Sequence, residues 1–444
     1  MNQPRLKEKS ILIPTLRLLT KPTAAFSAIH GQNGDLVLTR FFQKKLLFIS
    51  NPEHIEEVFA LEARNLISRD FLYEARKPLF RDGLINSRND LWKNQRRLLN
   101  PLFSKEAILN WKDLIIDSAE GLVDTLKNRA TTEVNLSVEI KQVVQTVLIG
   151  ILFGCSKGID EDKRLIEAID TITNGLIPQL ASEVLFKGKL KQLFAFKNNK
   201  FEKSINDFTA FVYQEMEQRK NPSGQDLISH MIRAKLKSSE YNMTSEQLKD
   251  EAVNLFFAGQ DTTNNSLLWF FYLIATNEAV HDKISAEIKR FKNDSLTPEN
   301  LDKLSYTKAV LYESLRLYPS IIALARQTKE EVQIGGYSIE KEANLFLSIY
   351  ATHRNKHLWE RPNAFYPEHF LEQAGCARHK YAFMPFGGGM HNCIGKHLAE
   401  MEMLLIIVTV LRAFSFKSNT VLREAVSITL KPDRDLIVSL QPND

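Results

Sequence analysis

The spacing of apolar residues predicts a mainly helical protein built around one long, buried helix. Residues 245–275 are apolar on nearly every side of a helix, and Thr244 and Gln247 have the spacing of a capping box directly before them. A helix without a polar face has to be covered on all sides by other parts of the chain. We therefore expect residues 245–275 to run through the centre of the molecule.

Shorter elements follow from the same patterns. Helical spacing predicts helices over residues 278–291, 306–318 and 393–413, and Pro319 ends the second of these. Alternating apolar residues near turn-forming ones predict paired strands over residues 35–39 with 46–49, 332–339 with 344–350, and 426–430 with 436–440. The expected fold class is mainly α with small β-sheets.

Composition supports one large globular domain over residues 1–444. Apolar residues make up 44% of the chain and charged residues 25%, and no Gly/Ser- or Pro-rich linker or repeat interrupts it. The 58 basic and 53 acidic side chains leave a net charge of +5, too small a bias to indicate binding to nucleic acid. We expect a monomer without a nucleic-acid partner.

The cysteines and the amino terminus indicate a cytoplasmic protein. Cys155, Cys376 and Cys393 are odd in number and lack zinc-site spacing, so neither a disulfide framework nor structural zinc is expected. The most apolar amino-terminal stretch, residues 11–19, contains a proline and an arginine and is about half as long as a membrane span requires. We expect neither a transmembrane anchor nor a signal peptide.

The segment most indicative of chemistry is residues 386–395, Phe-Gly-Gly-Gly-Met-His-Asn-Cys-Ile-Gly. Consecutive glycines allow a tight turn and a close approach of the backbone to another group. Cys393 follows them at the predicted start of a helix, where the helix dipole stabilises a thiolate, so its pKa is expected to be lower than that of a free cysteine. A buried structural cysteine beside a glycine turn is the alternative that these residues alone leave open.

This segment resembles the haem-binding loop of the cytochrome P-450 family, in its soluble bacterial type. The matching positions are Phe386, Gly387, Gly389, Cys393 and Gly395. The resemblance implies the cytochrome P-450 fold, haem b as the cofactor, and Cys393 as the thiolate ligand of its iron, which favours O–O cleavage. His391 occupies the position where the family usually has arginine. Its contact with a haem propionate is expected to depend on pH, because the charge of histidine does.

An acid and an arginine three residues apart can pair on a helix, and the chain contains three such pairs. They are Glu161 with Arg164, Glu287 with Arg290, and Glu313 with Arg316. Only the last is followed by Leu-Tyr-Pro and lies about 80 residues before Cys393, as the structural pair of the family does. His369 occupies the place of the arginine that normally joins this pair, so we expect a looser network.

Residues 258–263, Ala-Gly-Gln-Asp-Thr-Thr, are weak helix formers within the long apolar helix. A local kink satisfied by water would explain them without any chemistry. They also resemble the oxygen-binding motif of the family. That resemblance implies that Asp261 and Thr262 deliver protons during catalysis and that Gly259 leaves room above the haem.

Two further matches concern the haem propionates. Trp92 and Arg96, one helical turn apart, resemble a propionate-binding pair of the family, and Arg326 matches another propionate-binding position. Taken singly, a tryptophan near an arginine is commonly a stacked surface pair. The matches follow the order of the family from residue 92 to residue 395, so we expect Trp92, Arg96, Arg326 and His391 to hold the propionates.

The resemblance implies a monooxygenase that inserts one atom of O2 into an apolar substrate and reduces the other to water. The chain ends about 50 residues after Cys393, so electrons from NAD(P)H are expected to arrive through a separate ferredoxin or flavodoxin with its reductase. The basic residues expected to attract that acidic partner are Lys93, Arg97, Lys396 and His397. One alternative is a haem-thiolate peroxygenase or isomerase, but these enzymes do not need the proton delivery that the Asp261–Thr262 pair implies. The other alternative is a haem-binding sensor without catalysis.

The substrate pocket is expected to be apolar. By resemblance, its walls are the segment before Trp92, the long helix, the stretch after Pro319 and the carboxy-terminal turn. These segments contribute Phe71, Leu72, Leu79, Phe80, Leu84, Phe256, Phe257, Ile321, Ile322, Ala323 and Leu324, several of which could instead belong to the core. We expect hydroxylation or epoxidation of a fatty acid, terpenoid or steroid-like compound. The nearby Arg69, Arg76 and Arg81 could bind a carboxylate or simply be exposed.

Overall fold

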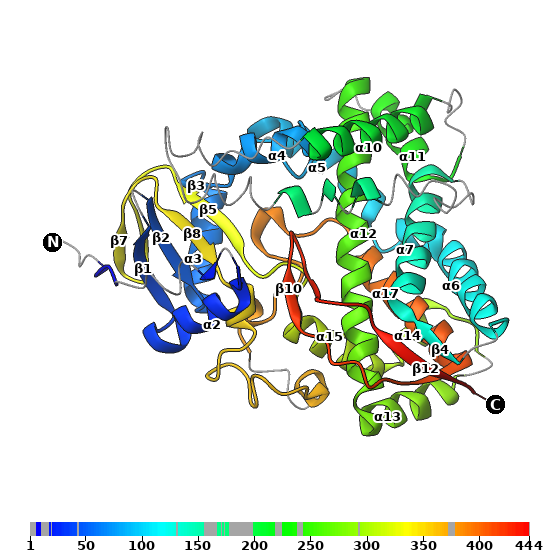
Figure 1. Ribbon diagram of the computed structural model, residues 1–444. Coiled ribbons are helices and arrows are strands. Elements are labelled where there is room, and N and C mark those ends of the chain that lie inside the picture. Colours follow the sequence, from blue (N-terminus) through cyan, green and yellow to red (C-terminus); the bar gives the residue numbers. More distant parts are fainter. Residues whose placement is uncertain are drawn as a thin grey trace.

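Figure 1 shows the computed structural model of the protein. The residues that the structure describes are 6–9, 17–18, 20–41, 44–129, 132–154, 167–169, 171–172, 174–176, 199–217, 224–237, 243–291, 294–371 and 378–443. Cys155, Cys376, the Glu161–Arg164 pair and most of residues 11–19 lie outside these ranges.

Helices form most of the described chain, as the pattern predicts. They are α2 (Pro22–Asn33), α3 (Pro52–Ala63), α4 (Tyr73–Phe80), α5 (Asn89–Leu99), α6 (Lys112–Lys127), α7 (Leu136–Phe153), α10 (Asn199–Glu217), α11 (Leu227–Lys237), α12 (Ser245–Ala275), α13 (Glu278–Lys289), α14 (Pro298–Asp302), α15 (Ser305–Leu317), α16 (Ile349–Thr352) and α17 (Lys396–Ala413). The predicted helices over 278–291, 306–318 and 393–413 correspond to α13, α15 and α17. The last begins three residues after Cys393, with Gly395 at its amino-terminal cap.

The long helix α12 has the predicted bounds and the predicted cap. The Thr244 hydroxyl accepts a hydrogen bond from Gln247 N at 3.1 Å, and the Gln247 side chain accepts one from Thr244 N at 2.8 Å. Most of its side chains are buried, because α7, α10, α15 and α17 pack around it. Figure 1 shows α12 passing through the middle of the helical part of the molecule.

A five-stranded sheet lies at the amino-terminal side of the molecule (Figure 1). Its strands, in spatial order, are β1 (Leu36–Phe41), β2 (Lys44–Ile49), β8 (Asn344–Leu347), β5 (Leu324–Thr328) and β3 (Ile67–Ser68). Side chains alternate between its two faces. Leu46 and Phe48 pack with residues of α2, whereas Leu47 and Ile49 pack with residues of α3. The sheet therefore fixes α3 and β5 relative to each other, and both contribute to the site described below.

The remaining strands form three small sheets, and two of the strand predictions are wrong in detail. The sheets are β6 (Val332–Ile334) with β7 (Tyr337–Ile339), β4 (Glu133–Asn135) with β12 (Ile437–Pro442) and β9 (Phe414–Lys417), and β10 (Glu424–Val426) with β11 (Leu430–Pro432). Residues 332–339 pair with themselves as a hairpin, because Gly335 and Gly336 adopt positive φ values of 58° and 76°. Residues 426–430 contain the turn between β10 and β11 rather than one strand, and Asn265 of α12 donates to Thr429 in that turn at 3.0 Å.

One described helix, α7, is long and apolar enough to cross a membrane. The mean hydropathy of Leu136–Phe153 is 1.6, and 67% of this segment is buried inside the protein. It packs against α6 and α12. The same composition is typical of a core helix in a large protein.

Candidate active site

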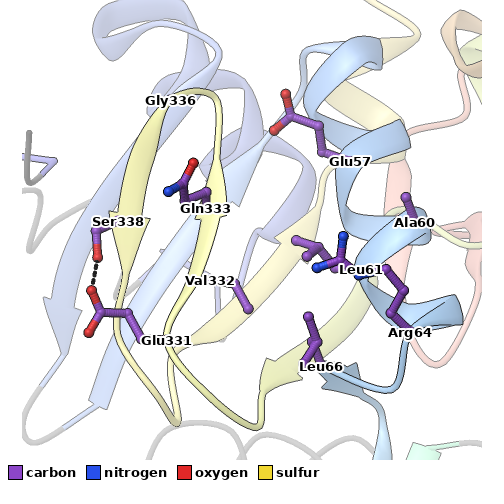
Figure 2. A pocket seen from close by; sticks show the side chains of 10 residues that line it. All are labelled: Glu57, Ala60, Leu61, Arg64, Leu66, Glu331, Val332, Gln333, Gly336 and Ser338. Carbon is purple, nitrogen blue, oxygen red and sulfur yellow. Dashed lines mark hydrogen bonds between the residues drawn. The ribbon is translucent and has the colours of Figure 1, made fainter. Parts of the chain in front are cut away.

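Two cavities differ in the chemistry that they bring together. The first, about 670 Å³, lies between α3 and the β6–β7 hairpin (Figure 2). Figure 2 shows Glu57 of α3 and Arg64, the residue after α3, on one side and Glu331, hydrogen-bonded to Ser338, on the other. Glu57 also accepts a hydrogen bond from Gly335 N at 2.6 Å. None of the residues expected from the sequence to carry chemistry lines this cavity.

The second cavity, about 360 Å³, contains the predicted chemistry. Cys393, Phe386, Gly387 and His391 line it from the cysteine loop, and Ala258, Asp261 and Thr262 line it from α12. The rest of its lining is mainly apolar. The structure thus brings together two motifs that are about 130 residues apart in the sequence.

The cysteine loop is a tight turn that requires glycine. Cys393 N donates to Phe386 O at 2.9 Å, which closes the loop on itself. Gly387 and Gly389 have φ values of 72° and 66°, in the left-handed region that glycine adopts without strain. A Cβ atom on Gly389 would also lie 2.7 Å from the ring of Phe59. The glycines therefore allow the loop to pack against α3 while Cys393 faces the cavity.

The expectation of a lowered pKa for Cys393 is wrong for the chain by itself. Cys393 is exposed to the cavity yet lies deep among protein atoms, and this burial raises the pKa of its thiol. The N–H of Gly395 and the guanidinium of Arg96 lower the pKa, but their effect is smaller. A metal ion that coordinates such a thiol deprotonates it directly, so the helix terminus is not needed for that step.

Three of the four predicted propionate contacts meet beside the cysteine loop. Trp92 of α5 is buried, and its ring centroid lies 4.0 Å from that of His391. One helical turn later, Arg96 donates to the carbonyl and the side-chain oxygen of Asn392, both at 2.9 Å. Helix α5 therefore holds the residue next to Cys393 and presents a cation at that point.

The fourth predicted contact, Arg326 on β5, belongs to the same cluster and is held by a residue that the sequence did not indicate. Its Nε lies 2.7 Å from Oε1 of Glu62, and this oxygen is 3.6 Å from Nε2 of His391. Glu62 is buried near the end of α3, where the sequence shows only an ordinary helical acid. Arg69 also lies nearby. Burial and repulsion by neighbouring arginines lower the pKa of Arg69 to about 9.

The protein's own groups favour the neutral form of His391. The predicted pH dependence of its contact with a propionate stays a prediction, because the negative charge of a propionate would raise the pKa of the imidazole. Burial lowers its pKa to about 2, and Arg69, Arg326, Arg96 and Arg76 lower it as well. A positive charge on the imidazole would add to those of the arginines that surround it. His391 can still donate one hydrogen bond as a neutral ring, and its Nδ1 is buried without a hydrogen-bond partner among the described residues.

The cluster suits the two carboxylates of a haem. Cations from α5, β5 and the segment before α4 converge beside the cysteine loop, and Glu62 is the buried carboxylate among them. Two propionates would supply the missing negative charge and an acceptor for His391 Nδ1. The residues present at the site therefore fit a haem, whose iron Cys393 would hold.

On the opposite wall, α12 continues as a helix through the weak helix formers at 258–263. The Thr262 hydroxyl donates to Ala258 O at 2.8 Å, and the Thr262 carbonyl accepts hydrogen bonds from Ser266 at 2.8 Å and from Ser320 at 3.1 Å. The expected role of Gly259 is wrong. A Cβ atom there would lie 3.0 Å from Leu148, so the absent side chain allows α12 to approach α7 and not the cavity.

The Glu313–Arg316 pair is fully buried at the centre of a tight network. Both oxygens of Glu313 accept from Arg316 at 2.7 Å, and Arg316 also donates to the carbonyls of His353, Pro362 and Ala364. His369 Nδ1 lies 3.0 Å from Glu313, and its Nε2 lies 2.5 Å from Glu360 O. The network is not loose, because both ring nitrogens of His369 are engaged. Glu287, by contrast, accepts from the first residues of α15 instead of pairing with Arg290.

The predicted substrate wall is right in part. Phe80, Phe257, Ile321 and Leu324 line the cavity, whereas Leu72, Leu79, Leu84 and Phe256 are buried and do not line it. Residues that line it without having been indicated by the sequence include Ile85, Ile349, Met403, Ile428 and Thr429. Of the three arginines that the sequence indicated near the pocket, Arg76 lines the cavity, Arg69 lies in the cation cluster and Arg81 is about half exposed.

A cysteine on a glycine turn, an adjoining cation cluster and a polar pair on a central helix define a haem-thiolate protein. A family model described as Cytochrome P450 matches residues 9–437. Probable cytochrome P450 4aa1 of Drosophila melanogaster is 28% identical over 414 residues, which cover 89% of this chain and 80% of that protein. Cytokinin hydroxylase of Arabidopsis thaliana is 27% identical over 370 residues, which cover 80% of this chain and 70% of that protein.

A solved structure, the crystal structure of cytochrome P450DA heme domain, has the same fold. Its TM-score is 0.85 at 20% sequence identity, over 100% of this chain and 98% of that one. The chain therefore belongs to the cytochrome P450 family and is a haem-dependent monooxygenase.

Proposed function

We propose that this monooxygenase hydroxylates or epoxidises a lipophilic small molecule bound in the cavity between α12 and the cysteine loop. The thiolate of Cys393 would hold the iron of haem b. The observation that carries the proposal is that Cys393 lines the same largely apolar cavity as Asp261 and Thr262. The haem, when bound, activates O2 and supplies the oxidising power. The protein supplies ligation, orientation and protons.

The cations beside the cysteine loop would hold the haem. Trp92 and Arg96 from α5, Arg326 from β5 and His391 would bind the propionates, and Phe386, Gly387 and Gly395 would shape the loop around the iron. The support for these roles is the convergence of positive charge described above. Glu62 would keep Arg326 in place, because a guanidinium held by one carboxylate loses little freedom on binding a second.

Asp261 and Thr262 would move protons to the reaction site. Both face the cavity from α12. The Thr262 hydroxyl, which donates to Ala258 O, can turn to another acceptor at the cost of one helix-internal hydrogen bond. A carboxylate beside a hydroxyl forms the short relay that proton delivery requires. Such a relay favours a monooxygenase over a carrier, for which proton delivery has no use.

The apolar lining supports a lipophilic substrate of the fatty acid, terpenoid or steroid class. Phe80, Phe257, Ile321 and Leu324 would gain roughly 25 cal/mol for each Å² of apolar ligand surface removed from water. Electrons from NAD(P)H would arrive through a ferredoxin or flavodoxin and its reductase. Lys93 and Arg97 are exposed on α5, the helix that contacts the cysteine loop, and would attract an acidic partner.

The test is the spectrum of the reduced carbon monoxide complex. The wild-type protein should show the long-wavelength band of a thiolate-bound haem, and Cys393→Ala should lose it, because no other ligand of the same kind lines the cavity within the described residues. Cys155→Ala and Cys376→Ala are the matched controls and should keep the band. Survival of the band in Cys393→Ala would refute the ligand assignment. Consumption of reductant only in the presence of substrate would separate an enzyme from a sensor.

A further inference from the structure

Arg76 is a cation in the wall of a largely apolar cavity. It lies on α4, and its neighbours in that wall include Phe80 and Ile85. Its guanidinium donates to three backbone carbonyls, those of Leu72 at 3.4 Å, Ile85 at 3.3 Å and Arg69 at 3.2 Å. Among the residues that the structure describes, no carboxylate forms an ion pair with it. The position of Arg76 is thus fixed by neutral acceptors, and the nearby Asp70 compensates its charge only in part.

The surroundings increase the affinity of Arg76 for an anion. Burial and, to a smaller extent, repulsion by Arg326 lower its pKa to about 10, against the opposite effect of Asp70. Arg76 therefore remains charged at neutral pH. Asp70 is partly exposed and lies 3.8 Å from Lys329, so it is shared with another cation. An anion that enters the cavity would find a charge-assisted donor in surroundings of low dielectric constant, where such a bond is strong.

Arg76 lies close enough to the haem cluster to lower the pKa of Arg69 and of His391, but the charges of that cluster can be balanced without it. Arg69, Arg96 and Arg326 carry three positive charges, and the buried Glu62 carries one negative charge. The two propionates of a haem would neutralise the difference. Arg76 is then a further positive charge that the two propionates do not balance, and it lines the cavity beside the apolar Phe80 and Ile85.

We propose that Arg76 binds the carboxylate of the substrate, so that the enzyme acts on lipophilic monocarboxylic acids. The inference rests on the proposed function, because it concerns the same cavity. It narrows the substrate class to compounds with one acidic group at the end of an apolar body, such as fatty acids or terpenoid acids. Arg76 is then a specificity-determining residue that selects the substrate and sets its orientation.

The experiment compares each acid with its methyl ester, which has the same apolar body without the charge. The probes are dodecanoic acid, abietic acid and their methyl esters, and binding is followed by the shift of the ferric haem from low to high spin at neutral pH. Wild type should bind the acids more tightly than the esters by about 10- to 100-fold, the range expected for a hydrogen bond to a charged group. Arg76→Leu and Arg76→Gln should abolish this difference, and the latter keeps donors for the backbone carbonyls.

Lys77→Leu is the matched control, because Lys77 is an exposed cation of the same helix that does not line the cavity. It should keep the preference for acids. Equal binding of acids and esters by wild type, or an unchanged preference in Arg76→Gln, would overturn the proposal. Loss of haem from both Arg76 variants would also overturn it, since Arg76 would then hold a propionate. A protein in which neither acids nor esters shift the spin state would contradict the lipophilic substrate itself, while the carbon monoxide spectrum tests Cys393 separately.

Discussion

Replacement of Glu313 by glutamine tests the energetics of the buried network in the core of this P450. The carboxylate of Glu313 accepts four hydrogen bonds. One oxygen accepts from Arg316 Nη2 and Tyr366 N, and the other accepts from Arg316 Nε and His369 Nδ1. Glu313→Gln keeps the shape of the side chain but turns one oxygen into a donor. Whichever oxygen is replaced, two donors lose their acceptor and face another N–H group.

The expected loss of stability follows from this geometry. Each buried donor left without an acceptor costs about 1–3 kcal/mol. Removal of one partner from a buried ion pair costs about 3–5 kcal/mol as a whole, because the remaining charge is uncompensated. The two figures describe overlapping contributions, since the same hydrogen bonds carry the ion pair. We therefore expect Glu313→Gln to lower the free energy of unfolding by about 3–5 kcal/mol.

Equilibrium urea unfolding of the haem-loaded protein, followed by tryptophan fluorescence and haem absorption, measures this loss. Glu278→Gln serves as the control, because Glu278 forms an exposed ion pair with Lys417 at 3.0 Å. Removal of such a surface pair should change the free energy of unfolding by less than about 1 kcal/mol. A loss of under about 1 kcal/mol for Glu313→Gln would refute the reasoning, since it would mean that water or a rearrangement satisfies the two donors that lost their acceptor.

Three other predictions concern protons, pH and electrons. Thr262→Ala should still bind haem and substrate but should divert electrons to peroxide, because a positioned hydroxyl is lost. The measurement is the amount of product formed per NAD(P)H consumed, and an unchanged ratio would exclude a role of Thr262 in proton delivery. Burial raises the pKa of Glu251 from 4.5 to about 8, so the folded protein retains a proton that the unfolded chain releases, and stability should fall as pH rises between these values. Glu251→Gln should remove the part of this loss of stability that Glu251 causes. The measurement is the urea midpoint at about pH 5 and at about pH 8, and an equal drop between the two pH values in wild type and Glu251→Gln would contradict the prediction. Reversal of Lys93 and Arg97 to glutamate should slow reduction by an acidic ferredoxin, most at low salt, and a rate independent of salt would argue against electrostatic attraction.

The sequence by itself determined those features that depend on neighbouring residues. The bounds and the cap of α12 depend on residues that are close in the sequence. Thr244 and Gln247 mark the start of the helix, and the apolar residues that follow on all its sides indicate that it is buried. The glycine turn before Cys393 is local as well, since positive φ values at Gly387 and Gly389 restrict the choice of residue. The order of the motifs along the chain was sufficient to indicate the family and the cysteine.

The tertiary structure decided the properties that depend on residues far apart in the sequence. Glu62, Arg76 and Arg326 come from α3, α4 and β5, and no local pattern shows that they converge. The pKa of His391 is lowered by surrounding arginines and by burial, and burial raises the pKa of Cys393 against the effect of its own helix. A pKa depends on the dielectric surroundings and on the distances to other charges, and both are set only when the chain is folded. For the same reason the sequence could indicate the cofactor loop and three candidate arginines, while only the tertiary structure showed that Arg76 is the one of these three that lines the cavity.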